Sequence, residues 1–288
     1  MNTKCRGEDN MNNVIGIKKA DTRDCIRVVT SNEFLKIEGL NKLSLKAIKL
    51  LYIVIAQCEM DDEDFYQITI TPTELQKLWG IKKQSVYRDL KKVSKELVKL
   101  FVSIENDDEE EFEHIPLFTK STYKKDPVSK EKHYIGKINN ESNFLFLKLH
   151  ENYSQPLLID FSQMKTVNSI LLWHLIQIKA KNKSRKPTGS KKIKSKVTVE
   201  EIRKATGTLE KYPKIQDLKR YLVDAAIKDI EKNCGVKIDY SYIKKERKIV
   251  GFEFIMTNKY AISREKLSPK GEKMLKRAES FNHGDILK

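Results

Sequence analysis

The side chains best suited to chemistry lie on the polar face of one amphipathic stretch, residues 214–230. Its apolar residues recur at helical spacing, and the opposite face carries Lys214, Gln216, Asp217, Arg220 and Asp224. The early turns of such a helix enter the major groove in helix-turn-helix proteins. An arginine there can bind guanine through two hydrogen bonds, and an aspartate can accept from cytosine N4 or hold the arginine in place. We interpret Lys214, Gln216, Asp217 and Arg220 as base-reading residues. The alternative is a solvated helix face, with an Asp217–Lys/Arg pair worth about 0.2–0.5 kcal/mol.

Two basic clusters flank this stretch and favour contact with DNA phosphates, which adds affinity without reading sequence. Segment 181–196 mixes Lys and Arg with Gly and Ser, and 244–248 forms a charged turn between two alternating runs. A plain flexible insertion is the alternative for the first segment. The predicted phosphate contacts are Lys181, Lys183, Arg185, Lys186, Lys191, Lys192, Lys194, Lys196, Lys219, Lys244, Lys245, Arg247 and Lys248.

A second amphipathic stretch, residues 82–100, also has a basic face opposite its apolar stripe. Its surroundings are close to neutral, so we expect weaker DNA binding there, or a role mainly in assembly. The predicted auxiliary DNA contacts are Lys82, Lys83, Gln84, Ser85, Arg88, Lys91 and Lys92.

The charge of the 288-residue chain is unevenly distributed. Positions 1–160 carry 25 Lys and Arg against 26 Asp and Glu, whereas positions 161–288 carry 31 against 14. A net charge of +16 that resides in one half indicates a polyanionic partner for that half, with nucleic acid favoured over membrane. A merely soluble basic domain is the alternative. No apolar run approaches the ~20 residues that span a bilayer, and the N-terminal residues lack an apolar signal core, so we expect a cytoplasmic protein.

Enzyme signatures are absent from the sequence. There is no GxxxxGK[ST] phosphate loop, and the histidines form no His-x-His or HExxH pair: His114, His133, His150, His174 and His283. The four cysteines are widely spaced with no CxxC pair, so we expect neither a zinc site nor a disulfide framework. We therefore expect no catalytic residues, metal or cofactor.

The elements that would position the base-reading residues follow one another in the order of a winged helix-turn-helix. Thr198 and Glu201 form a predicted capping box at the start of a short helix, and Gly207 permits the turn that ends it. The longer amphipathic helix comes next. The alternating runs VKIDYSYI and IVGFEFIM then predict a hairpin.

The same series occurs earlier in the chain. Thr71-x-x-Glu74 with Gly80 corresponds to Thr198-x-x-Glu201 with Gly207, and Asp89-Leu90-Lys91 corresponds to Asp217-Leu218-Lys219 one residue further on. Upstream, Leu50-Leu51-Tyr52 pairs with Leu171-Leu172-Trp173. Three ordered matches indicate a structural duplication.

The predicted fold class is therefore α+β, with two tandem winged helix-turn-helix domains related by duplication. We expect a loose N-terminal arm (1–30), a first domain (31–155), a second domain (156–257) and a basic C-terminal tail (258–288). The runs FVSI, FEHIPLF, HYIGKI and NFLFLKL predict strands for the sheet and wing of the first domain. The acidic run 105–113 is expected to be a solvated loop, where contact with phosphate would be repulsive.

At this point the sequence resembles the iteron-binding plasmid replication initiators of bacteria, the RepB- or RepA-type initiators. The resemblance covers roughly residues 30–257. It is strongest in LEKYPKIQDLKRYLVDAAIKDIEKNCGVKIDYSYIKKERKIVGFEF, and LKAIKLLYIVIAQC and TPTELQKLWGIKKQSVYRDLKKVSKEL also match the family pattern.

The resemblance implies a protein without enzymatic activity whose C-terminal domain reads directly repeated origin sites, with base contacts from Lys214, Asp217 and Arg220. It also implies an N-terminal domain for dimerisation and backbone contact. Monomers would bind the repeats and open the origin, and dimers would repress the promoter through an inverted repeat. The implied partners are the host initiator protein and the replicative helicase. The alternatives are a winged-helix transcriptional regulator and, less favoured, a nicking or priming replication enzyme.

Overall fold

The computed structural model describes residues 28–57, 68–106, 108, 110–127, 130–147, 153–154, 156, 158–180 and 192–258. The chain divides into two compact units, Met1–Asn152 with Leu157–Ser162, and Tyr153–Pro156 with Gln163–Lys288. The predicted boundary between residues 155 and 156 falls in this region, where Tyr153–Pro156 belong to the second unit and Leu157–Ser162 to the first. Residues 157–162 join the first unit because Phe161 packs on Tyr52, with ring centroids 4.2 Å apart.

The packed part of the first unit begins before the predicted domain start at residue 31. Val28 and Thr30 are fully buried, so the expected loose arm cannot extend to residue 30, and residues 1–27 lie outside the described residues. The elements are β1 (Thr30–Ser31), 3₁₀ turns at Asn32–Lys36 and Leu40–Lys42, α1 (Leu45–Ile55), α2 (Pro72–Trp79), α3 (Lys83–Leu97) and α4 (Leu158–Gln163).

The three long helices of this unit hold one another through a small polar contact beside the apolar core. The Trp79 Nε1 donates to the Lys46 carbonyl of α1 at 3.1 Å, and the Lys46 Nζ lies 2.5 Å from the Asp89 carboxylate of α3. On α3 the inward face is the predicted one, because Val86, Leu90, Val93 and Leu97 are buried.

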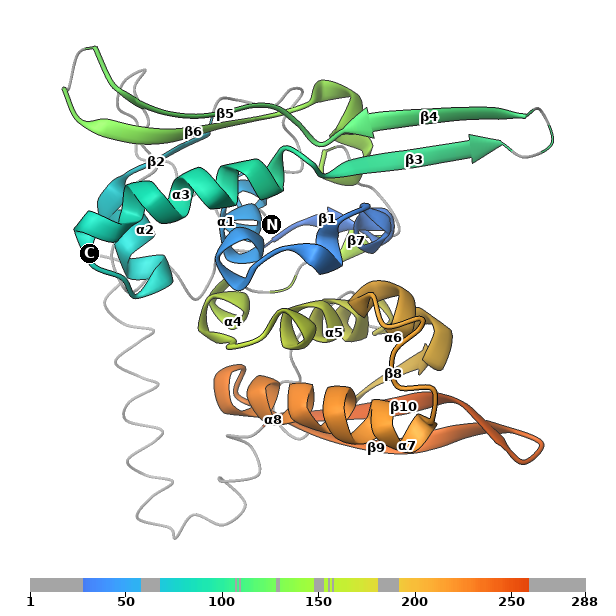
Figure 1. Cartoon of the computed structure of the whole chain (residues 1–288). Helices are drawn as coiled ribbons and strands as arrows, with labels where there is room; N and C mark the ends of the chain where they lie inside the picture. The colour runs from blue at the N-terminus through green and yellow to red at the C-terminus, as the bar shows by residue number, and fades with distance from the viewer. Residues whose placement is uncertain are drawn as a thin grey trace, which may run out of the picture. The chain divides into compact units, whose positions relative to one another are not determined.

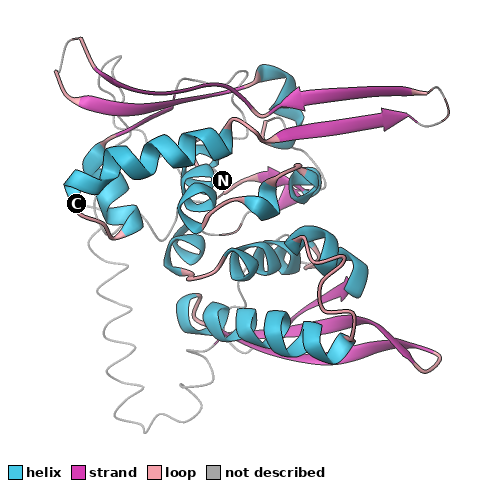
Figure 2. Ribbon diagram, viewed as in Figure 1, coloured by secondary structure: helices cyan, strands magenta, loops and turns pink. Residues whose placement is uncertain are grey.

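The first unit contains two separate antiparallel sheets (Figures 1 and 2). One has the order β2-β6-β5 and the other pairs β3 with β4. The bounds are β2 (Ile68–Ile70), β3 (Phe101–Asn106), β4 (Glu111–Pro116), β5 (Phe118–Lys125) and β6 (Lys132–Ile138). The acidic run is therefore a hairpin and not the expected loop, since cross-strand pairs continue as far as Asn106 and Glu111. The wing of this unit is the β5–β6 hairpin alone.

The predicted strand NFLFLKL is wrong within the described residues. Residues 140–145 form a 3₁₀ turn that begins where the Asn139 side chain accepts from the Glu141 amide at 3.3 Å. Leu145, Phe146 and Leu147 are all buried, so the run does not alternate between a buried and an exposed face as a half-buried strand would.

The second unit repeats the arrangement. Its elements are β7 (Tyr153–Ser154), α5 (Val167–Ile178), β8 (Ile193–Thr198), α6 (Val199–Thr206), α7 (Ile215–Leu218), a π-helical turn (Lys219–Val223), α8 (Asp224–Asn233), β9 (Val236–Lys245) and β10 (Lys248–Asn258). The sheet order β8-β10-β9 corresponds to β2-β6-β5, and each sheet is joined to a capped helix followed by a longer one. The two predicted winged-helix domains are confirmed.

The predicted basic segment 181–196 ends in a strand that the sequence analysis missed. Ile193, Ser195 and Val197 are buried and alternate with the exposed Lys194 and Lys196, the two-residue period of a strand. β10 runs close beside it, because a Cβ on Gly251 would lie 2.6 Å from the Val197 carbonyl oxygen. Only glycine fits there without a shift of the backbone.

No helix in the described part of the chain is long and apolar enough to cross a membrane.

Candidate nucleic-acid interface

The longer helix after each capped helix is called the recognition helix below: α3 in the first unit, and the run from α7 through α8 in the second. The turn before the second recognition helix is held in place by one arginine. Both predicted capping boxes form, and Gly80 and Gly207 adopt φ of 63° and 64° at the helix ends. From α6 the Arg203 guanidinium donates to the Thr208 carbonyl at 2.9 Å, to the Tyr212 carbonyl at 2.5 Å and to the Lys211 carbonyl. These bonds fix the path of residues 207–214 and so the point at which α7 starts.

The predicted base-reading residues lie together at the start of this helix. Lys214 is the N-cap and is exposed, Gln216 and Arg220 are exposed, and Asp217 is half-buried in the first turn. All four therefore lie within the first two turns, the part of a helix-turn-helix that reaches base edges.

The helix that carries them is not continuous α-helix as predicted. The turn Lys219–Val223 is π-helical, and both Leu222 and Val223 are buried. A π-turn inserts one residue into a helix and occurs frequently at functional sites. The expected single stripe is replaced by two adjacent buried rows, Leu222 with Ala226 and Val223 with Ile227.

A polar network spans the π-turn. The Asp224 carboxylate accepts from Lys219 Nζ at 2.9 Å and from the Tyr240 hydroxyl of β9 at 2.6 Å. Partial burial of Asp224 opposes its ionisation, but the bonds from Lys219 and Tyr240 outweigh this and lower its pKa. The same bond to Asp224, with a further one to Tyr240, raises the pKa of Lys219. Lys219 was predicted to contact phosphate, and in this structure its ammonium group is engaged by Asp224.

Two tyrosines beside Arg220 were missed by the sequence analysis. The Arg220 guanidinium lies 5.4 Å from the ring centroid of Tyr221, and Tyr221 stacks on Tyr212 at 6.0 Å with 23° between the rings. Tyr221 is 54% exposed. An exposed aromatic ring beside an exposed arginine at a helix start was the available signal.

The structure aligns the two recognition helices differently from the sequence analysis. Up to Leu90, each residue of α3 corresponds to a residue four positions further along the second helix than the sequence comparison gave. Counted from the N-caps Lys82 and Lys214, Gln84 corresponds to Gln216, Val86 to Leu218, Arg88 to Arg220 and Leu90 to Leu222. The sequence register paired Leu90 with Leu218, because the turn covers residues 80–82 in one unit and 207–214 in the other. The structural register gives both helices the same exposed face, Lys-x-Gln-x-x-x-Arg.

Most of the auxiliary residues lie where they were predicted. Lys82, Lys83, Gln84, Arg88, Lys91 and Lys92 are exposed along α3, and Ser85 is half-buried. Asp89 bonds to Lys46 at 2.5 Å and lies 3.5 Å from the Arg88 Nε. These bonds, that of Lys46 first, lower the pKa of Asp89.

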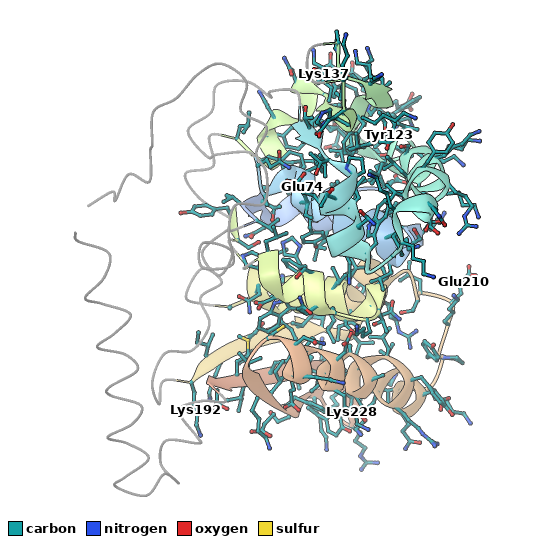
Figure 3. The ribbon with its side chains drawn as sticks, turned by 90° about the vertical axis from the view of Figure 1, so that its left-hand side faces the viewer. Glu74, Tyr123, Lys137, Lys192, Glu210 and Lys228 are labelled. Carbon is teal, nitrogen blue, oxygen red and sulfur yellow. The ribbon has the colours of Figure 1, made fainter. Side chains whose placement is uncertain are left out.

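The first unit is near neutral in total, but its charges are segregated. The wing carries exposed lysines that the sequence analysis did not single out: Lys120, Lys124, Lys125, Lys130, Lys132 and Lys137. Lys137 and Tyr123 project from this wing in Figure 3, and Tyr123 lies 5.9 Å from Tyr87 of α3. The acidic residues gather on the β3–β4 hairpin instead. We expected weaker DNA binding because the total charge of this unit is near zero. The surface formed by α3 and the β5–β6 wing is nevertheless basic.

The wing of the second unit is the β9–β10 hairpin. The predicted cations at its turn are exposed: Lys244, Lys245, Arg247 and Lys248. Glu246 between them adopts φ of 56°. Lys181, Lys183, Arg185, Lys186 and Lys191 lie outside the described residues, and their contacts remain predictions.

The remaining predicted cations of the basic segment face away from the helices. Ser195 Oγ donates to the Ile176 carbonyl of α5 at 2.9 Å, which sets the inner side of β8. Lys194 and Lys196 therefore lie on the outer side of the sheet, 3.9 and 3.7 Å from Glu253 of β10. Lys192, at the start of β8, is also exposed (Figure 3).

Among the described residues no three His, Cys, Asp or Glu side chains are placed to hold a metal ion. His174 is packed in α5, fully buried, with its Nε2 3.0 Å from Ser154 Oγ. Burial lowers its pKa to about 3.

Two family models match this chain, and solved structures align with it. A family model described as Initiator Replication protein, WH1 matches residues 27–177, and one described as Initiator Rep protein, WH2 matches residues 198–256. Among solved structures, the Pi initiator protein in complex with iteron DNA aligns with a TM-score of 0.65 and 20% identity, over 82% of this chain and 98% of that chain. Domains 2 and 3 of RctB align at a TM-score of 0.37 and 9% identity, over 76% and 81% of the two chains. No curated protein matches. The chain belongs to the family of replication initiator proteins built from a WH1 and a WH2 domain.

Proposed function

We propose that this initiator binds directly repeated double-stranded sites at a plasmid origin, as the Pi initiator in the matched structure binds iteron DNA. The observation that carries the proposal is the shared exposed face of α3 and α7, with a glutamine and an arginine at the same distances from their N-caps. Two such helices can each lie in one major groove. The repeat unit should then extend over about two turns of DNA, roughly 20 base pairs.

The two units would divide the work. Lys214, Gln216, Asp217 and Arg220 read bases, and the second wing grips the backbone on either side. The α3 face and the β5–β6 lysines add contacts to phosphates, for which exposed flexible cations are sufficient. Binding rather than catalysis would carry the activity.

Further steps complete the proposal. Monomers occupy the repeats and open the origin, and dimers formed through the first unit bind an inverted repeat in the promoter and repress it. The host initiator protein and the replicative helicase are the protein partners, and the cytoplasm is the place of action.

The experiment that tests the proposal is a replication assay in a competent host. A plasmid carrying only the candidate origin should replicate when this protein is supplied in trans and should be lost without it. Arg220→Ala should abolish maintenance, whereas Lys232→Ala, an equal loss of charge on the last turn of α8, should preserve it. A protein that represses its promoter but never maintains the plasmid would be a winged-helix transcriptional regulator, the alternative that shares this fold.

A further inference from the structure

The β3–β4 hairpin of the first unit has no third strand in the described part of the chain. Its outer half is open to solvent, with Phe112 73% exposed and Ile104 47% exposed. The base of the hairpin is anchored by a bridge from Glu38 to Phe101 and by the buried Val102 and Ile115, so the outer half is the part that nothing in the described chain covers. A large exposed apolar side chain on such an element, here Phe112, marks a surface for a partner, whereas Ile104 lies on the opposite face because it pairs with Glu113.

One face of the hairpin is ordered by a ring ladder. His114 lies 5.4 Å from Phe101 and 5.2 Å from Phe112, centroid to centroid. Ser103, opposite His114 in the ladder, donates to Glu38 at 2.8 Å and lies 3.1 Å from His114 Nδ1. These contacts hold Phe112 in an exposed position without covering it.

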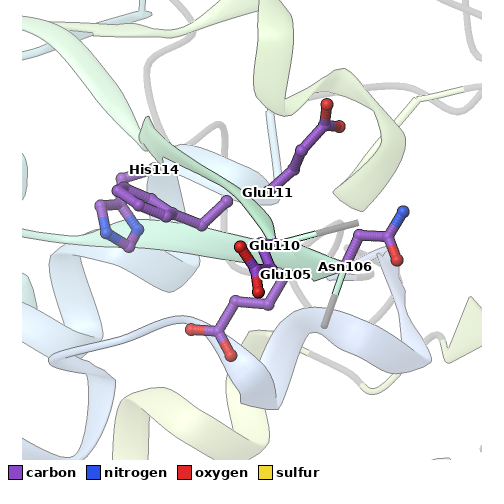
Figure 4. A pocket seen from close by; sticks show the side chains of 6 residues that line it. Glu105, Asn106, Glu110, Glu111 and His114 are labelled. Carbon is purple, nitrogen blue, oxygen red and sulfur yellow. The ribbon is translucent and has the colours of Figure 1, made fainter. Parts of the chain in front are cut away.

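The same hairpin carries carboxylates, and none of them forms an ion pair within the described residues: Glu105, Asp108, Glu110, Glu111 and Glu113. Several line a shallow hollow beside Phe112 (Figure 4). Within the first unit the hairpin projects from the C-terminal end of α3, whereas the β5–β6 wing extends toward the N-terminal end (Figure 1). The carboxylates are thus kept apart from the surface that would meet phosphates.

The arrangement of the sites limits what can cover this face. Copies bound to direct repeats are related by translation along the DNA, so a contact between them must join two different surfaces. A two-fold contact between two such hairpins would also bring like charges together. The complementary surface must therefore be basic and must lie outside the DNA-reading elements.

The outer face of the β8–β10–β9 sheet meets both conditions. Lys192, Lys194, Lys196 and Lys237 are exposed there, against the acidic Glu253 and Asp239. The half-buried Ile255 of β10, opposite Lys194, adds an apolar contact. Helices α5 and α8 pack on the opposite side, as the bonds from Ser195 to the Ile176 carbonyl and from Tyr240 to Asp224 show.

We propose that the β3–β4 hairpin of one copy docks on the outer face of the β8–β10–β9 sheet of a second copy bound to the adjacent repeat. The contact is heterologous, acidic and aromatic on one side, basic on the other. It makes occupation of direct repeats cooperative. The inference rests on the proposed function, since the repeats set the symmetry.

The test uses the full chain and a binding site selected from a random duplex pool. Three probes carry one site, two sites in direct orientation, and two in inverted orientation, with centres a whole number of turns apart. The wild type should bind the direct pair cooperatively through the hairpin, whereas binding to the inverted pair, the arrangement that dimers occupy, should not depend on the hairpin. Glu105→Lys with Glu110→Lys, two carboxylates that line the hollow beside Phe112, should lower cooperativity about fivefold, the contribution of two solvent-exposed ion pairs of ordinary strength.

Matched variants separate this contact from general electrostatics. Glu33→Lys with Glu141→Lys adds the same charge elsewhere on the first unit and should leave cooperativity intact. Lys194→Glu with Lys196→Glu should lower it, and the combination of both charge-reversed pairs in one chain should restore it. Cooperativity confined to the inverted pair, or unchanged in the hairpin variant, would overturn the inference while single-site binding upholds the proposed function. Failure to select any specific site would overturn both.

Discussion

Replacing Arg220 with alanine tests the assignment of the second recognition helix. The guanidinium is exposed near the start of the helix and rests on the Tyr221 ring at 5.4 Å. It forms no ion pair within the described part of the chain, so the substitution leaves no buried group without a partner. The free energy of unfolding should change by less than about 0.5 kcal/mol.

The effect on binding should be larger. A two-bond contact between arginine and guanine contributes about 1–3 kcal/mol of discrimination, so affinity for the selected site should fall about 5- to 150-fold. Affinity for a scrambled duplex should change little. Arg88→Ala should cost less at its equivalent place, because Arg88 lies 3.5 Å from the Asp89 carboxylate and must leave it to reach DNA.

The measurement is fluorescence anisotropy on both duplexes at several salt concentrations, with Lys232→Ala as the control for loss of charge on the same helix. A base-reading Arg220 predicts a loss on the selected site alone, with an unchanged salt dependence. An equal loss on both duplexes, with the salt slope reduced by about 1, would refute the reasoning and assign Arg220 to a phosphate.

Three further predictions concern the second unit. Alanine at the four cations of the β9–β10 turn should lower the slope of log K against log salt concentration by up to about 3.6. Alanine at Lys194 and Lys196 should change single-site binding little. Equal slopes for the two variants would contradict the placement of β8. Gly251→Ala should destabilise the unit by about 1–3 kcal/mol in urea denaturation, because its Cβ would lie 2.6 Å from the Val197 carbonyl oxygen. As pH falls from about 6.5 to about 3, stability should decline by up to about 1.4 kcal/mol per unit, since the unfolded chain protonates His174 before the folded one does. His174→Gln should flatten that profile, and a wild-type midpoint independent of pH would count against it.

The parts of the fold that were predicted from sequence depend on local chemistry. The capping boxes at Thr71 and Thr198 need only a side chain and a backbone three residues apart, and both form. The apolar stripe on α3 repeats without interruption, and the β9–β10 hairpin keeps its two-residue period except for one register shift between Ile249 and Gly251. The candidate base-reading residues follow from the apolar residues of stretch 214–230, because an apolar face defines the opposite polar face.

Some missed features depend on residues far apart in the chain. Others were missed because many charged residues concealed the two-residue period of a strand. The π-turn is bridged by Asp224 and Tyr240, sixteen positions apart in the chain, which no local pattern reveals. The lysines at alternate positions of β8 were interpreted as part of a basic loop. Ile193, Ser195 and Val197 nevertheless follow the two-residue spacing of a strand. The β3–β4 carboxylates were read as a loop because their charge outweighed the alternation beneath it.

The structural register also gives a physical reason for unequal roles of the two helices. Because the π-turn absorbs one residue, the buried Val93 and Leu97 of α3 correspond to Ala226 and Ile230. On the exposed side, Lys91 of α3 then corresponds to Asp224, whose carboxylate is engaged by Lys219 and Tyr240. Past its arginine α3 continues with the exposed Lys91 and Lys92, whereas the second helix has Asp224 and Ala225 at these places and its next exposed lysine is Lys228. A long row of lysines suits phosphates, and a short face that is interrupted after an arginine beside an exposed ring suits bases. The helix of the second unit is therefore the better candidate for sequence discrimination, although both helices begin with the same face.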